Sequence, residues 1–289
     1  MGFFKTIFLP ITAPIKFIQE HFKATVFVFI LILLLMPNEN STSFNHNLEK
    51  INLVGPIFDA TEVVEKIDKA TKNDQVKGIL FCVDSPGGAV APSIEISYAI
   101  KRATAKKPVV VYAKGTIASG SYYASIWADK IISNPGSMVG SIGVIMQGAD
   151  MSELMSKIGI KSQTVQAGKY KQVGTTDRPW KDYEINELNK VIRDTYDMFS
   201  YDVANARELD FNKRDLYANA HIFTASQAQK VGLIDDLGVE VDAQKELVHL
   251  SGVQDPIWNQ EDKFEKIIKK LSTSTAVALY TYFPKISLQ

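Results

Sequence analysis

The chain has 289 residues, 22% of them charged, and its 32 Lys and Arg balance its 32 Asp and Glu. The length suits one large domain or two small ones, and the charge balance gives no basic excess for binding nucleic acid. One cysteine, Cys82, lies in an apolar run, so the sequence offers neither an internal disulfide nor a cysteine-built zinc site.

An apolar segment near the N-terminus comes first. Residues 24–37 are uncharged and apolar but short for a membrane span of ~20 residues, and the residues from 17 onward supply the missing length. Lysines precede this segment and none follows until Lys50, so the positive-inside rule puts residues 1–16 in the cytoplasm. The alternative is a cleavable signal peptide. The long stretch before the apolar segment and the missing A-x-A cleavage motif argue against it. We expect an uncleaved anchor over 17–37 in the cytoplasmic membrane, with the rest outside the cytoplasm.

A polar, turn-rich linker over 38–48 leads to a main domain over 49–250, and 251–289 form a separate amphipathic tail. Within the main domain, apolar strands alternate with helices, which indicates an α/β domain with a mostly parallel sheet covered on both faces. In chain order, the sequence predicts strands at 50–58, 76–85, 108–115, 129–135, 139–146 and 161–168, and helices at 61–72, 93–104, from about 119, 151–159 and 181–209.

The turn "GTIASGSYYAS", after the strand at 108–115, is the first candidate site. It lacks the lysine of a phosphate-binding P-loop, and the G-x-S-x-G nucleophile elbow is absent. Ser119 is predicted near a helix N-terminus, where the helix dipole and free N–H groups stabilise negative charge, as a serine nucleophile and its oxyanion require. The simpler explanation is that Ser119 only caps the helix.

A second turn, "VDSPGGAV", ends the preceding strand of the predicted sheet. Gly87 and Gly88 allow a substrate to approach the backbone closely, and they offer N–H donors for an oxyanion hole. Because neighbouring parallel strands bring their carboxyl ends to one edge, we expect both turns to lie there together. The shared edge favours a site over two unrelated turns.

The residues alone leave the general base open. The histidines do not lie in stretches typical of a base-bearing loop, although His221 stays an alternative. A desolvated lysine can serve instead, because burial lowers the pKa of its ammonium group. Lys169 and Lys171 lie between two glycines in "AGKYKQVG", and either can also be an ordinary surface lysine.

Over roughly 49–245 the chain resembles the signal peptide peptidase (protease IV) family in its short single-repeat form. It carries, in the family's order, "DSPGG", "ASGSYYAS", "NPGSMVGSIGV", "GKYK" and "FTASQAQKVGLIDDLG". The family reads "ASGGYY" where this chain has Ser121, which makes Ser121 a decoy serine, as Lys169 is a decoy lysine. The resemblance implies a crotonase-like or Clp-protease-like fold and a Ser–Lys dyad. Its implied residues are the nucleophile Ser119, the general base Lys171, Ser141 to orient the lysine, and oxyanion donors at Gly120 and at Gly88 or Gly87.

The resemblance also implies an activity: a membrane-anchored serine endopeptidase that needs no metal or cofactor and degrades released signal peptides or other apolar peptides. A single unit has to shield its site, so we expect a homo-oligomer in which Lys171 of one copy serves Ser119 of the next. Two alternatives are a crotonase-type acyl-CoA enzyme, which would need no serine nucleophile, and a non-catalytic membrane scaffold. The intact set of Ser119, Ser141 and Lys171 argues against the scaffold.

Overall fold

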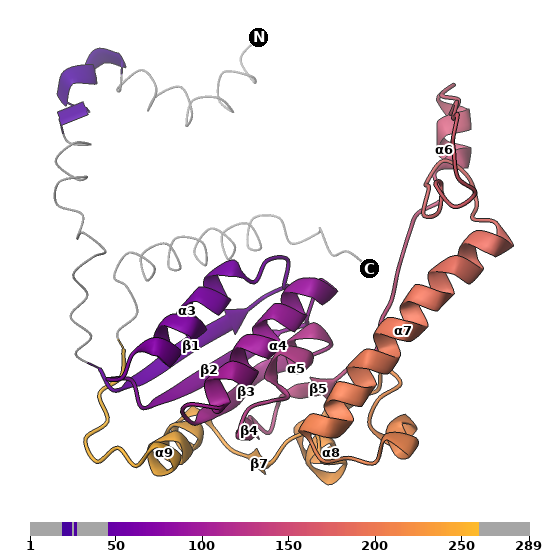
Figure 1. Ribbon diagram of the computed structural model, residues 1–289. Coiled ribbons are helices and arrows are strands. Elements are labelled where there is room, and N and C mark those ends of the chain that lie inside the picture. The colour runs from indigo at the N-terminus through magenta and orange to yellow at the C-terminus, as the bar shows by residue number, and fades with distance from the viewer. Residues whose placement is uncertain (1–18, 25, 28–45, 260–289) are drawn as a thin grey trace. The chain divides into compact units, whose positions relative to one another are not determined.

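The alternating strands and helices build one sheet in the computed structural model, which describes residues 19–24, 26–27 and 46–259 (Figure 1). Within these residues the strand order is β1-β2-β3-β4-β7, and β5 and β6 extend the sheet from β3. The strands are β1 Leu48–Val54, β2 Gly78–Ser85, β3 Val109–Ala118, β4 Lys130–Ser133, β5 Met138–Gly140, β6 Ile222–Thr224 and β7 Asp236–Leu237.

Every strand pair is parallel except β5 with β6, so the predicted mostly parallel sheet is confirmed. The long strand β3 pairs with β4 through its first half and with β5 through its second half. The helices are α3 Thr61–Lys72, α4 Val90–Thr104, α5 Gly120–Ser125, α6 Ser152–Lys157, α7 Asp182–Ala206, α8 Ala225–Lys230 and α9 Glu240–Ser251, with a short 3-10 helix at Phe211–Leu216.

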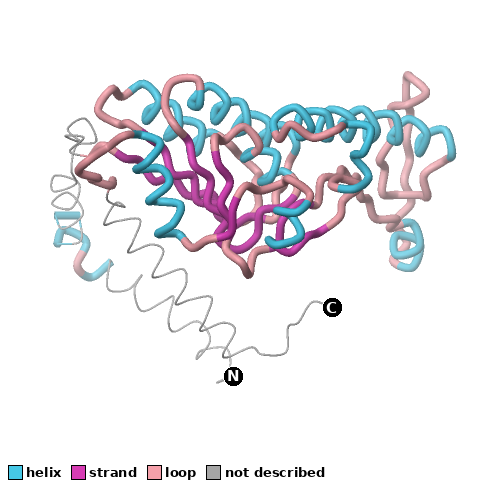
Figure 2. Tube along the Cα trace, turned by 90° about the horizontal axis from the view of Figure 1, so that it is seen from below, coloured by secondary structure: helices cyan, strands magenta, loops and turns pink. Residues whose placement is uncertain are grey.

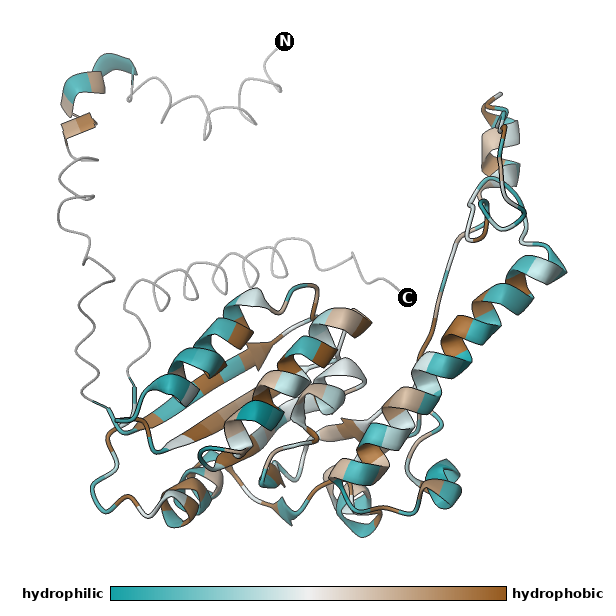
Figure 3. Cartoon of the chain, viewed as in Figure 1, coloured by the Kyte–Doolittle hydropathy of each residue, from teal (hydrophilic) through white to brown (hydrophobic). Residues whose placement is uncertain are grey.

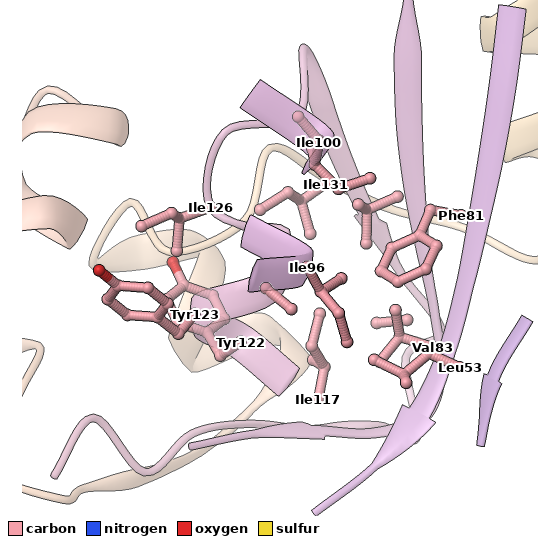
Figure 4. Packing of buried hydrophobic residues seen from close by; sticks show 14 of the residues in the cluster. Leu53, Phe81, Val83, Ile96, Ile100, Ile117, Tyr122, Tyr123, Ile126 and Ile131 are labelled. Carbon is pink, nitrogen blue, oxygen red and sulfur yellow. The ribbon is translucent and has the colours of Figure 1, made fainter. Parts of the chain in front are cut away.

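The sheet buries both of its faces, and helices lie on both sides of the strands (Figure 2). On one face, side chains of β1–β4 pack against α3, α4, α5 and the C-terminal half of α7, and Figure 4 shows Phe81, Ile96 and Tyr122 meeting there. On the other face, Leu80 and Val110 pack against Leu247 of α9. This double burial is why β2 and β3 are apolar without alternation, and their ribbons are mostly brown in Figure 3.

Residues 144–181, here called the arm, connect β5 to α7 without joining the sheet. The arm lies at the N-terminal end of α7 and carries α6 (Figure 1). The strand predicted at 139–146 stops at Gly140, and the strand predicted at 161–168 is wrong: these residues form an exposed loop. Val165 is fully exposed there, because no strand of the described chain runs beside it.

The predicted anchor and most of the tail lie outside the described residues. No helix in the described ranges combines the length and the apolar character that crossing a membrane requires. At the other end, Leu48 of β1 pairs with Trp258, and the Asn259 side chain donates to the Lys50 carbonyl. The first residues of the predicted tail, up to 259, therefore extend along β1.

Candidate active site

Ser119 occupies the turn between β3 and α5 in a strained conformation, with φ 54° and ψ −125°. A positive φ costs free energy for a residue other than glycine and persists only where the surroundings enforce it. Two hydrogen bonds do so here. The Ser119 N–H donates to the Gly140 carbonyl over 2.8 Å, and the Tyr123 N–H donates to the Ser119 carbonyl over 3.0 Å. The half-buried serine is thereby fixed between β5 and α5.

The explanation that Ser119 merely caps α5 does not fit the structure. Its side chain accepts no hydrogen bond from the N–H groups of the first helical turn. Of those N–H groups, the one on Tyr123 donates to the Ser119 carbonyl, and the one on Gly120, directly beside the serine, has no acceptor among the described residues.

Gly88 and Gly120 bring two unused N–H donors together at this edge of the sheet. A Cβ atom on Gly120 would lie 3.3 Å from the Gly88 nitrogen, and one on Gly87 would lie 2.5 Å from the Gly120 nitrogen. In the described part of the chain, neither the Gly88 nor the Gly120 N–H finds an acceptor, whereas the Gly87 N–H donates to the Ser85 hydroxyl. This geometry favours Gly88 over Gly87 as the donor and gives Gly87, with φ 89°, the role of shaping the turn.

Ile57 holds the glycine turn in place. Its N–H donates to the Gly87 carbonyl over 2.9 Å, and its carbonyl accepts the Ala89 N–H over 2.7 Å. A Cβ on Gly88 would lie 2.1 Å from the Ile57 carbonyl oxygen, so only glycine fits at this position.

A mainly apolar cavity of about 110 Å³ opens beside the serine. The cavity is lined by segments that lie far apart in the sequence. These are the glycine turn, α4, α5, the chain after β5, and α7. Such a lining suits an apolar side chain of a peptide substrate. The lining residues are Gly88, Val90, Ser93, Ile94, Ser119, Gly120, Tyr123, Gly143, Val144, Ile145, Thr195, Met198 and Phe199.

Tyr123 joins the cavity to α7. Its hydroxyl donates to Asp202, and its ring meets Phe199 edge to face with 4.8 Å between centroids. Burial, reinforced by Asp202, raises the pKa of the Tyr123 phenol, so it stays protonated and does not act as a base. The pair fixes α7 against the helix that begins at the serine.

The decoy serine, Ser121, is fully buried and is not among the residues that line the cavity. Its hydroxyl donates to the Ser85 carbonyl over 2.6 Å and accepts the Ala118 N–H over 2.9 Å. Both atoms belong to strand ends, so Ser121 ties β2 to β3 and is not available as a nucleophile.

Ser141 directly follows the residue whose carbonyl holds Ser119. It also has a positive φ, 50°, and its N–H donates to the His221 carbonyl over 2.7 Å. Asn219 and Ala220 have φ of 55° and 57°, so four of the strained residues gather around this edge. His221 contributes its backbone here, while its exposed ring packs beside Phe223.

Lys171 lies elsewhere, in the arm. It sits in a turn over 168–174, which contacts Tyr183 near the N-terminus of α7, whereas Met198 of the same helix lines the cavity. These two residues are 15 positions apart, or about 22 Å along a helix that rises ~1.5 Å per residue. Within one chain, the structure therefore brings Ser119, Ser141 and the glycines together but not Lys171.

The two lysines of this turn differ in their surroundings. The Lys169 ammonium lies over the Tyr183 ring, 4.9 Å from its centroid. Among the described residues the exposed Lys171 ammonium makes no ion pair, hydrogen bond or ring contact. Lys169 thus contacts a residue of its own chain, whereas the Lys171 side chain is exposed to solvent. The described ranges contain no group of His, Cys, Asp and Glu placed to hold a metal ion.

Comparison with known proteins agrees with this geometry. The model of the family described as Peptidase family S49 matches residues 101–254. A protein of Methanocaldococcus jannaschii named "Putative protease" is 42% identical over 198 residues, 68% of this chain and 64% of its own length. A protein of Enterococcus faecium named "Putative signal peptide peptidase SppA" is 32% identical over 69% of this chain and 62% of its own length. The chain thus spans somewhat less than two thirds of these relatives.

Among solved structures, the S97A mutant of the 1510-N membrane-bound stomatin-specific protease has a TM-score of 0.52 at 12% identity, and the match covers 75% of this chain and 99% of that one. This likeness concerns the fold alone, and it agrees with the expected α/β architecture with a mostly parallel sheet and flanking helices.

Proposed function

The chain belongs to peptidase family S49, the signal peptide peptidase family of serine peptidases, and from this premise we propose that it is an endopeptidase with Ser119 as nucleophile and Lys171 of a second copy as general base. The observation that carries the proposal is the strained Ser119 beside the free N–H groups of Gly88 and Gly120, at the mouth of an apolar cavity.

In the proposed reaction, the neutral Lys171 amine takes the proton from the Ser119 hydroxyl, and the resulting oxygen nucleophile attacks the peptide carbonyl carbon. The carbonyl oxygen becomes negatively charged, and the Gly88 and Gly120 N–H groups donate to it. The lysine ammonium then gives its proton to the leaving amine as the peptide bond breaks. Water, activated by the same lysine, releases the acyl group and restores the serine.

Supply of Lys171 by a second copy follows from the distance within one chain. The lysine is presented on an exposed arm, and the site is incomplete without it. The arm and its surroundings also leave large apolar side chains exposed, as expected of a surface that a second copy covers. These include Ile145, Leu154, Ile158, Ile160, Val165 and Val191.

We further propose a single-pass anchor over 17–37, with the peptidase domain outside the cytoplasm, and peptide substrates rich in apolar residues, such as released signal peptides. The apolar run and the lysine asymmetry of the sequence support the anchor, and the lining of the cavity supports apolar substrates. The acyl-CoA enzyme is not favoured, because its chemistry gives no role to a strained serine.

The test uses the full chain in detergent. Ser119→Ala removes the nucleophile and almost no volume, so it should lower kcat for an apolar peptide by at least about 10⁴-fold while thermal unfolding stays unchanged. Ser125→Ala, which removes a buried hydroxyl one turn further along α5, is the matched control and should retain activity. A fluorophosphonate should label wild type on Ser119. Labelling of another serine, or an active Ser119→Ala variant, would refute the assignment.

A further inference from the structure

We propose that Arg178 and Glu184 are positioning residues that hold the turn carrying Lys171 in the shape needed to enter the site of a second copy. This inference rests on the proposed Ser–Lys dyad. It assigns to the Arg178–Glu184 ion pair of the arm the role of holding Lys171 in position for that dyad.

The two side chains form a bidentate ion pair at the start of α7. The Arg178 Nη1 and Nη2 atoms each lie 2.8 Å from a Glu184 carboxylate oxygen, and the Lys181 N–H donates to the same carboxylate over 2.8 Å. The Glu184 side chain is completely buried, in a part of the molecule where most side chains are exposed. A fork-to-fork pair of this kind fixes direction as well as distance.

Arg178 also contacts the turn that carries Lys171. Its Nη2 atom also donates to the Gln172 Oε1 atom over 3.2 Å, and Gln172 directly follows Lys171. On the other side, the Tyr183 ring meets Tyr170 edge to face with 5.8 Å between centroids.

The turn is thus held to the first turns of α7 on both sides of Lys171. Lys169 and Tyr170 contact Tyr183 before it, and Gln172 contacts Arg178 after it. Lys171 is the residue of this run whose side chain points to no partner among the described residues. Holding the neighbours and leaving the lysine free is the arrangement that a base delivered to another chain requires, because its backbone has to be ordered before the copies meet.

Other contacts do not depend on the ion pair. Within the arm, the Trp180 indole N–H donates to the Thr175 carbonyl over 2.7 Å, and a Cβ on Gly148 would lie 2.3 Å from the Trp180 ring. Between the arm and α7, Lys169 and Tyr170 keep their contacts with the Tyr183 ring. Replacing Arg178 should therefore loosen the lysine turn while the arm stays on α7, so Arg178→Gln is a usable variant.

The test follows the effect of Arg178→Gln through mixed oligomers, expressed together and shown to contain both chains. The reference mixes Ser119→Ala chains, which supply the lysine, with Lys171→Ala chains, which supply the serine. Adding Arg178→Gln to the lysine-supplying chain should lower kcat by at least about tenfold more than adding it to the serine-supplying chain, because misplacing a catalytic group by 1 Å can cost ~10²-fold. Arg193→Gln, at an exposed arginine of α7, is the matched control for both mixtures.

An equal loss in both mixtures would show a general structural role and overturn the inference, as would no loss in either. If the reference mixture itself is inactive although mixed oligomers form, the dyad between copies is rejected. The role of the pair towards a second copy is then rejected with it, and a chain with Ser119 and Lys171 intact decides whether the pair positions Lys171 within its own chain: Arg178→Gln must lower kcat about tenfold at unchanged KM, and an unchanged kcat overturns this role too.

Discussion

Ser119 lies on a turn surrounded by buried residues, whereas Lys171 lies on an arm whose residues are almost all exposed. The serine turn takes its shape from β3, β5 and α5 and from the apolar core beneath them. The arm has no such core, and it takes its shape from the Arg178–Glu184 pair and a few ring contacts. One chain thus completes the surroundings of Ser119, and in the proposed arrangement the base comes from a second copy.

The largest expected effect comes from removing the base on the arm. Lys171→Ala should lower kcat by about 10²–10⁴-fold, because no other group can take the Ser119 proton. Lys171→Arg should be equally inactive, since arginine does not give up its proton. Lys169→Ala, which removes only a lysine held over the Tyr183 ring, is the matched control for peptide hydrolysis assays. If Lys169→Ala is the inactive variant, the two lysines must exchange roles.

Apart from Ser119 itself, the residues around the serine should be most sensitive to substitution at the glycines. In Gly120→Ala the new Cβ would lie 2.2 Å from the Ser93 hydroxyl oxygen and 3.3 Å from the Gly88 nitrogen, so the oxyanion donors must shift. We expect kcat to fall by about 10²-fold with a small change in KM. Gly136→Ala, where the nearest atom to the new Cβ is an Asn134 oxygen at 3.4 Å, should behave as wild type. Equal kcat values for the two variants would remove Gly120 from the oxyanion hole.

Acid should loosen the arm. The Arg178 guanidinium, together with the Lys181 N–H, lowers the pKa of Glu184 from 4.5 to about 2. Because the folded-state pKa lies below the unfolded one, the ion pair stabilises the arm fully above about pH 4.5, and this contribution is lost as the pH falls from there towards 2. Hydrogen exchange of the arm should show wild type better protected than Glu184→Gln at pH 6, with the difference shrinking below pH ~4.5. A difference that is constant with pH would contradict this.

The smallest effect is expected where α7 packs against α5, at Tyr123 and Asp202. Tyr123→Phe removes the hydroxyl that donates to Asp202 and keeps the ring against Phe199, so the free energy of unfolding should fall by about 1 kcal/mol. Tyr98→Phe, at a tyrosine that is 45% exposed, is the control and should change it by less than about 0.5 kcal/mol. Equal values in denaturant titrations would show that this hydrogen bond does not couple α7 to α5.

How far the sequence predicts the structure differs between these regions. The helix predicted at 61–72 has those bounds, and the two turns predicted to share a sheet edge do meet, because apolar strands and adjacent glycines are local signals. The left-handed φ of Ser119 has no such signal, since serine does not favour it and the Gly140 carbonyl that enforces it comes from 21 positions later.

The arm was the least predictable part. The strand expected at 161–168 is absent because a strand needs a neighbour to pair with, and the described chain provides none. The sequence analysis does not predict the Arg178–Glu184 pair, although it has a trace in the sequence: Glu184 follows Lys181, where the expected helix begins, by three positions, and a carboxylate there commonly accepts a hydrogen bond from the helix start. The strands after α7, β6 and β7, are short and exist only through their pairing with β5 and β4.

The length of α7 between the lysine turn and the cavity affects when the protein becomes active. In the proposed arrangement a newly made chain is inert, because its lysine turn and the cavity beside its serine contact α7 at two residues, Tyr183 and Met198, that lie about 22 Å apart along the helix. Hydrolysis then starts only when copies encounter one another, so the specific activity should rise with protein concentration and vanish on dilution. In this arrangement the encounter of copies activates the protein, the proposed anchor would favour that encounter, and no precursor has to be cleaved.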